Sequence, residues 1–154
     1  MATPTTTLVH ATAVAVAGRG VLLLGSSGAG KSDLALRLIT TPLVHDSNPV
    51  DVRLISDDQV IVARHGDRLF ASAPGTIAGQ LEVRGVGIVP FPFVKSAELR
   101  LAVTLQPADR IDRMPEPDQR HTILGLDMPL VAIDGSKPGA SARVMLAALN
   151  QPKK

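Results

Sequence analysis

The chain has 154 residues, of which 45% are hydrophobic and 19% charged. This length and apolarity predict a single globular domain over residues 1–154 and exclude a disordered chain. The 16 Lys and Arg residues almost balance the 14 Asp and Glu residues, aromatic residues make up only 2%, and cysteine is missing. These values argue against nucleic acid as a partner and exclude a disulfide framework, a cysteine-ligated zinc site and a cysteine nucleophile.

The apolar residues 8–17 near the start resemble the hydrophobic part of a secretory signal. No Lys or Arg precedes them, however, and Arg19 follows closely. No segment reaches the about 20 apolar residues that a membrane-spanning helix needs. The sequence therefore predicts a cytoplasmic protein without a membrane partner.

The first half of the chain predicts two strands, a helix and a third strand. Residues 9–17 alternate, and after a Gly-Arg-Gly turn residues 21–24 are apolar throughout, which is typical of a strand covered on both faces. Residues 31–40 carry apolar side chains on one side and predict a helix. A loop with Pro42 and Pro49 follows, and then a strand over residues 52–56.

The second half predicts mostly strands. Residues 60–63 and 69–73 flank a hairpin turn, and a glycine-rich loop over residues 74–87 contains a short strand at 80–84. Residues 99–105 and 130–133 predict strands, residues 107–118 an exposed irregular crossing, and residues 141–149 a closing helix. The fold class predicted is α/β.

A phosphate-binding loop of the form G-x-x-x-x-G-K-[ST] lies between the apolar strand and the amphipathic helix, which is the context that this motif requires. Its backbone N–H groups and the helix N-terminus favour phosphate oxygens. The lysine would meet the β- and γ-phosphates of a nucleotide, and the last serine would ligate Mg²⁺. The residues predicted to bind the nucleotide are Gly25, Ser26, Ser27, Gly28, Ala29, Gly30, Lys31 and Ser32.

Acidic residues elsewhere suggest phosphoryl transfer. Asp57 and Asp58 follow the strand 52–56, where a carboxylate can hold Mg²⁺ through water or take a proton from an attacking hydroxyl. Neighbours on a strand point to opposite faces, so we expect one of the pair to do so. Glu82 precedes two closely spaced glycines, Gly85 and Gly87, which allow a backbone to approach a ligand.

These segments, in this order, resemble the bacterial HPr kinase/phosphorylase family. The resemblance rests on His10, the loop ending in Gly30-Lys31-Ser32, the Ile-Ser-Asp-Asp run at 55–58, and the Glu-Val-Arg-Gly-Val-Gly-Ile run at 82–88. It covers residues 10–150 and corresponds to the family's C-terminal catalytic domain, as in short proteobacterial forms. It implies a phosphate-loop kinase core related to phosphoenolpyruvate carboxykinase, with a mixed sheet and hairpins.

The resemblance also implies an activity and site residues. Family members use ATP, or in some cases pyrophosphate, to phosphorylate a serine of the phosphocarrier protein HPr, and can reverse the modification with inorganic phosphate. By position, His10 and Arg113 correspond to active-site residues, Lys31 to the loop lysine, and Ser32 and Glu82 to ligands of Mg²⁺. One of the paired aspartates, Asp57 or Asp58, would be the base for the seryl hydroxyl.

Two departures from the family bear on reversal and assembly. Ala140 stands where the family often has an arginine associated with dephosphorylation, so we expect forward transfer to exceed reversal. The sequence reaches Lys154 soon after the closing helix, so we expect no counterpart of the further helix that many members use in contacts with HPr and neighbouring subunits. A monomer and an assembly of identical subunits both remain alternatives.

The sequence thus predicts a protein-serine kinase that uses ATP and Mg²⁺ and acts on an HPr-like protein in regulation of the phosphotransferase system. Two alternatives remain: a small-molecule kinase on a similar loop, and a nucleotide-binding regulator with little turnover. The identity of the phosphoryl acceptor separates the three.

Overall fold

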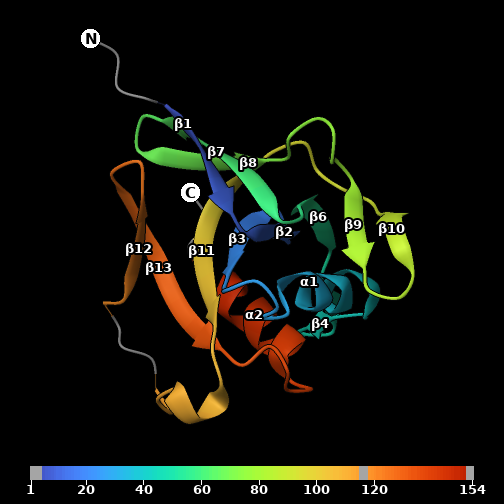
Figure 1. Cartoon of the computed structure of the whole chain (residues 1–154). Helices are drawn as coiled ribbons and strands as arrows, with labels where there is room; N and C mark the ends of the chain where they lie inside the picture. Colours follow the sequence, from blue (N-terminus) through green and yellow to red (C-terminus); the bar gives the residue numbers. More distant parts are fainter. Residues whose placement is uncertain (1–4, 115–117, 152–154) are drawn as a thin grey trace.

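The computed structural model describes residues 5–114 and 118–151 of the chain. Within these ranges nine strands form one mixed sheet (Figure 1). Seven of them follow the order β1-β7-β8-β11-β3-β2-β6, and the other two branch from β11, with β13 paired to β11 and β12 paired to β13. The strands of this sheet are β1 (Thr6–His10), β2 (Thr12–Val16), β3 (Arg19–Leu24), β6 (Val52–Ser56), β7 (Gln59–His65), β8 (Arg68–Ser72), β11 (Ala97–Leu105), β12 (Arg120–Ile123) and β13 (Leu126–Ile133).

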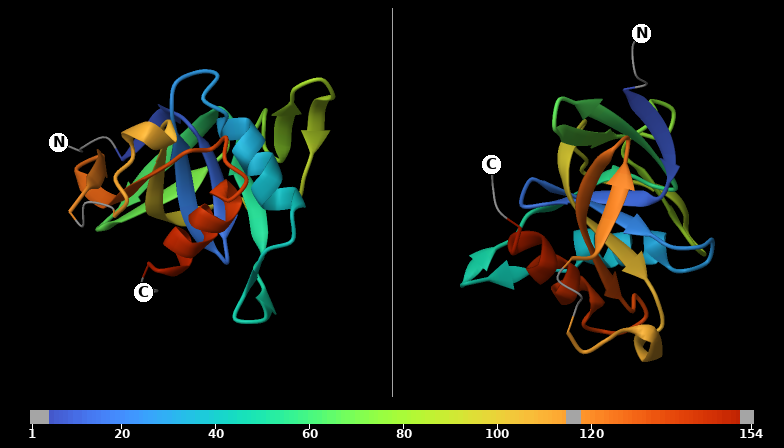
Figure 2. Two further views of the ribbon diagram at one scale, coloured as in Figure 1. Left: turned by 90° about the horizontal axis from the view of Figure 1, so that it is seen from below. Right: turned by 90° about the vertical axis from the view of Figure 1, so that its left-hand side faces the viewer.

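Two helices cover one face of the sheet, and two small hairpins project beside them. Figure 2 shows α1 (Lys31–Thr40) and α2 (Ala140–Leu149) on the same side of the sheet. The hairpins are β4 (Val44–His45) with β5 (Asn48–Pro49), and β9 (Gln80–Val83) with β10 (Gly87–Pro90). A 3₁₀ turn, η1 (Ala108–Arg110), follows β11. Among the described residues, no helix has the length and apolarity needed to cross a membrane.

The central strand β3 is buried on both faces, as its uninterrupted apolar sequence predicts. Val21 and Leu23 belong to the hydrophobic cluster under the two helices, whereas Leu22 belongs to a second cluster on the opposite face. Leu34 and Leu38 of α1 complete the first cluster, since they are at most 1% exposed. Burial of each such side chain contributes about 1.5–3 kcal/mol, so this packing holds β3 and α1 in a defined relative position.

The strand directions bring several loops to one edge of the sheet. β11 is parallel to β3 and to β13, and its final residues pair with Leu24 and Ile133. β6 is antiparallel to β2, which is antiparallel to β3, so β6 ends at the same edge as β3. The segments that follow β3, β6, β11 and β13 therefore leave the sheet together, and they include the phosphate-loop motif and the paired aspartates.

Most of the predicted elements are confirmed: the helix at 31–40, the strand at 52–56, the hairpins and the α/β class. The strand expected over residues 9–17 is wrong as a single element, because the chain breaks at the buried Ala11. β1 pairs with β7, whereas β2 pairs with β3 and β6. The strands β10 and β12 were not expected, nor was the short hairpin of β4 and β5 within the predicted loop after α1. Residues 115–117 of the predicted crossing lie outside the described residues.

Candidate active site

The phosphate loop joins β3 to α1 in a tight curve that depends on glycine. Gly30 caps α1 with φ of 94°, a left-handed conformation that glycine adopts without steric cost. At Gly25 an added Cβ would lie 2.9 Å from the Ala29 Cβ, so a larger residue would push the loop open. Within the loop, the Ala29 N–H donates to the Ser26 carbonyl at 3.0 Å. This curve directs the start of α1, with its N–H groups, toward the loop interior.

Lys31 lies inside this curve. Its ammonium donates hydrogen bonds to the carbonyls of Gly25 at 2.7 Å and Ser26 at 3.1 Å, and the residue is 7% exposed. A buried ammonium needs oxygen partners, and the loop carbonyls supply them. The side chain is thus held within reach of any anion that the loop enclosed.

Asp57 is the buried centre of the site. Its Oδ1 accepts hydrogen bonds from the Ser32 hydroxyl at 2.6 Å and from the Thr12 hydroxyl at 3.0 Å. Its Oδ2 accepts one from the backbone N–H of Glu82 at 3.1 Å. The carboxylate, 7% exposed, therefore connects three segments that are distant in sequence: the start of β2, the start of α1 and the strand β9.

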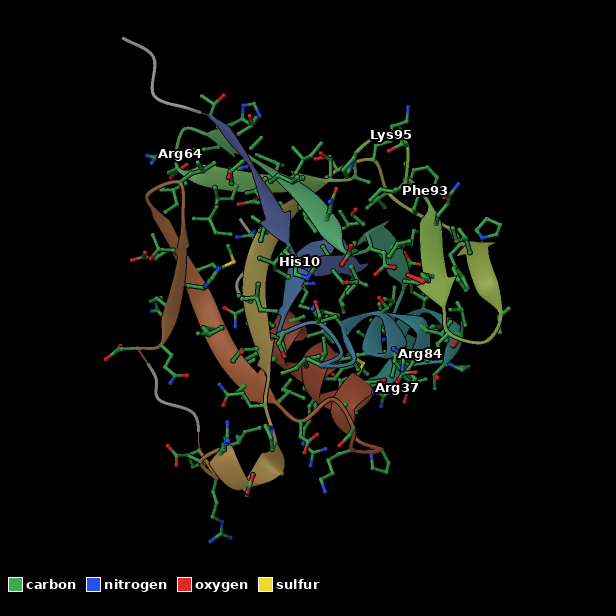
Figure 3. The ribbon with its side chains drawn as sticks, viewed as in Figure 1. His10, Arg37, Arg64, Arg84, Phe93 and Lys95 are labelled. Atoms are coloured by element: carbon green, nitrogen blue, oxygen red, sulfur yellow. The ribbon has the colours of Figure 1, made fainter. Side chains whose placement is uncertain are left out.

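Asp58, the next residue, is exposed where Asp57 is buried. Its side chain is 68% exposed, and its Oδ1 lies 3.5 Å from Nδ1 of His10, whose side chain is 53% exposed. The backbone at Asp58 has φ of 70°, so the chain reverses between β6 and β7 in a left-handed conformation. Figure 3 shows His10 near the middle of the molecule, at the end of β1 and above the phosphate loop. The two aspartates, equivalent in sequence, thus have different surroundings.

Glu82 reaches the site through its backbone, while its side chain is exposed. Arg84, labelled in Figure 3, lies in the turn of the same hairpin of β9 and β10 and is exposed. Arg113 is also exposed, and it makes no hydrogen bond or ion pair within the ranges 5–114 and 118–151. The structure therefore joins His10 to Asp58, and Ser32 and Glu82 to Asp57, but leaves Arg113 unconnected to them.

The late loop between β13 and α2 is tied to α1. The Arg37 guanidinium donates hydrogen bonds to the carbonyls of Gly135 and, at 3.3 Å, Lys137. Hydrogen bonds from the Ser136 hydroxyl, and from the backbone N–H groups of Ser136 and Ala108, lower the pKa of Asp134 below its ordinary value of 3.8. Ala140 is fully buried at the start of α2, so an arginine at this position would have to displace core side chains.

The sequence reasoning missed Thr12 and Arg37, because each acts through a contact with a residue far along the chain. Thr12 contacts residue 57 and Arg37 contacts residue 135, and no local motif marks either pairing. The alternation of β2 shows only that Thr12 lies on a strand. Within the described residues, no group of three or more His, Asp or Glu side chains is arranged as a complete metal cage.

With this geometry established, comparison with known proteins defines the class. A sequence model described as the HPr Serine kinase C-terminal domain matches residues 2–153. The HPr kinase/phosphorylase of Geobacillus thermodenitrificans is 33% identical over 158 residues, and that of Halalkalibacterium halodurans is 34% identical over 158 residues. Each match covers 94% of this chain and 48% of the relative, so the chain spans about half the length of these curated relatives.

Among solved structures, the Hpr(Ser) kinase/phosphatase from Coxiella burnetii has a similar fold. The TM-score is 0.73 at 23% sequence identity, over 94% of this chain and 95% of that one. The chain belongs to the HPr kinase C-terminal domain family. The resemblance predicted from the sequence and the α/β phosphate-loop fold are both confirmed.

Proposed function

We propose that this chain is a protein-serine kinase that transfers the γ-phosphoryl group of ATP to a serine of an HPr-like phosphocarrier protein, in a reaction that requires Mg²⁺. The observation that carries the proposal is the pair of aspartates at one sheet edge. Asp57 accepts a hydrogen bond from the hydroxyl of the loop serine Ser32, and Asp58 is exposed beside His10. In a site of this form, one carboxylate lies beside the metal ion that phosphoryl transfer requires, and the other accepts the proton of the attacking hydroxyl.

Nucleotide phosphates fit the loop because its N–H groups and Lys31 supply positive charge at one point. Lys31 would exchange the carbonyls of Gly25 and Ser26 for phosphate oxygens, and so neutralise charge on the moving group.

Mg²⁺ fits the oxygen donors beside the loop. The ion usually takes only one or two protein ligands and fills its octahedron with water and substrate phosphates, so a complete protein cage is not required. The Ser32 hydroxyl would be a direct ligand, Asp57 would hold that hydroxyl or a bound water, and the Glu82 side chain would complete the site from β9. When bound, the ion would offset the charge that develops on the transferred phosphoryl group.

Asp58 is the proposed base. It would take the proton from the serine hydroxyl as the oxygen attacks the γ-phosphorus, the bond from that phosphorus to the β–γ bridging oxygen would break, and ADP would leave. His10 would keep the carboxylate in position. Arg113 remains a proposed active-site residue that would reach the phosphate from the segment after η1.

The openness of the base favours a protein acceptor. Asp58 and His10 are both more than half exposed, so a serine on a protein surface loop can reach the carboxylate. Two open surface hollows, of about 510 and 200 Å³, are lined by residues outside the site. A phosphocarrier acceptor places the reaction in the cytoplasm, in regulation of the phosphotransferase system.

The test is incubation of the purified chain with γ-labelled ATP, Mg²⁺ and an HPr-like protein, followed by mass mapping of the acceptor. We expect label on one serine, and none after omission of Mg²⁺ or after Ser→Ala replacement in the acceptor. Label on a metabolite would support the small-molecule kinase instead. Bound nucleotide without any labelled acceptor would support the regulator.

A further inference from the structure

The hydroxyl of Thr12 makes two hydrogen bonds that no motif predicts. Thr12 is the first residue of β2 and is fully buried. Its Oγ1 donates to Oδ1 of Asp57 at 3.0 Å and accepts from the backbone N–H of Asp58 at 3.3 Å. One buried hydroxyl therefore contacts the carboxylate of one aspartate and the backbone of the next.

The backbone of Asp58 is held from a second side as well. Its carbonyl accepts a hydrogen bond from the Ala11 N–H at 3.2 Å, so residues 11 and 12 together bracket Asp58. The bracket fixes a turn in which Asp58 has φ of 70°, a left-handed conformation that is uncommon for non-glycine residues and that aspartate adopts more readily than most. His10, which faces the Asp58 carboxylate, directly precedes the same two residues.

We propose that Thr12 is a positioning residue for phosphoryl transfer. Its hydroxyl fixes the carboxylate of Asp57, which holds Ser32, relative to the backbone of Asp58, which carries the base. The inference rests on the proposed function, because it assigns the two aspartates to separate roles. Removal of the hydroxyl would leave the loop and Lys31 in place, but would allow the backbone turn at Asp58 to move relative to Asp57 and Ser32. A displacement of this kind lowers the rate of the chemical step more than the affinity for nucleotide.

The test compares Thr12→Val, which keeps the shape and removes the hydroxyl, with Thr12→Ser, which keeps the hydroxyl. Thr122→Val is the control for loss of a threonine–aspartate hydrogen bond away from the site, since the exposed Thr122 hydroxyl donates to Asp127 in the hairpin of β12 and β13. We expect Thr12→Val to lower kcat by about ten- to a hundredfold with nucleotide affinity little changed. Thr12→Ser should restore most of the rate, and Thr122→Val should match the parent chain.

A second measurement reads the geometry without activity. Hydrogen exchange of the Asp58 amide, followed by NMR, should become faster in Thr12→Val and stay slow in Thr12→Ser and Thr122→Val. The inference is overturned if Thr12→Val keeps the parent kcat, or if rate and nucleotide affinity fall together and serine rescues neither. If the parent chain labels no acceptor, the proposed function fails, and the kinetic comparison no longer applies. The exchange rate of the Asp58 amide then tests the positioning contact by itself, and an unchanged rate in Thr12→Val refutes it.

Discussion

Replacement of Asp57 by asparagine should destabilise the fold, because this carboxylate is a buried acceptor for three hydrogen bonds. In Asp57→Asn one carboxylate oxygen becomes an NH2 group, which cannot accept a hydrogen bond. If the amide oxygen stays toward Ser32 and Thr12, their two bonds keep a neutral acceptor and each weakens by about 1 kcal/mol, whereas the Glu82 N–H loses its acceptor, a bond of about 1.5–3 kcal/mol. The expected loss in the free energy of unfolding is therefore about 3–5 kcal/mol.

The neighbouring substitution Asp58→Asn is the matched control. The Asp58 side chain is 68% exposed, and asparagine tolerates the left-handed backbone at this position, so the free energy of unfolding should change by less than about 0.5 kcal/mol. Urea unfolding of both variants gives the comparison, and thermal unfolding should show a Tm lower by about 10–15 °C for Asp57→Asn alone.

Kinetics then separate the proposed roles. Asp58→Asn should bind nucleotide with nearly the parent affinity and lose phosphoryl transfer, because a base acts only in the chemical step. Asp57→Asn should lose transfer and also require more Mg²⁺. Equal unfolding free energies for the two variants would refute the hydrogen-bond argument, and a fully active Asp58→Asn would refute the base.

Three further perturbations test other parts of the site. Lys31→Ala should lower kcat by about a thousandfold with the fold retained by circular dichroism, and a near-parent rate would remove the loop from the active centre. Glu82→Gln should raise the Mg²⁺ concentration for half-maximal rate, whereas Glu98→Gln, on β11, should not; equal metal dependence would make Glu82 an ordinary exposed charge. Ser136→Ala should raise the pKa of Asp134 toward 3.8 in an NMR titration, because it removes the largest of the hydrogen bonds that stabilise the carboxylate. The stability linked to this lowered pKa is present above pH 3.8 and is lost as the pH falls through the folded-state pKa, and a value already at 3.8 in the parent chain would contradict the assignment.

The phosphate loop was predictable from the sequence because its parts are contiguous. An apolar strand, a glycine-rich turn and an amphipathic helix follow one another within residues 21–40, and local backbone preferences decide each of them. The strand 52–56 and the hairpin around Gly66 were predictable for the same reason. The family resemblance also identified His10 and Glu82 as candidate site residues, and their roles remain predictions.

Only the tertiary structure distinguished the two aspartates. Asp57 and Asp58 are adjacent and chemically identical, so nothing in the local sequence states which of them is buried. Contacts from β2, α1 and β9 surround Asp57 with donors, while the left-handed turn exposes Asp58 beside His10. The break at Ala11, which sends β1 and β2 to different neighbours, likewise depends on pairings with residues of β6 and β7 that lie 36 or more positions away. Such contacts depend on how the strands are ordered in the sheet, and that order is a property of the packed chain rather than of any segment in it.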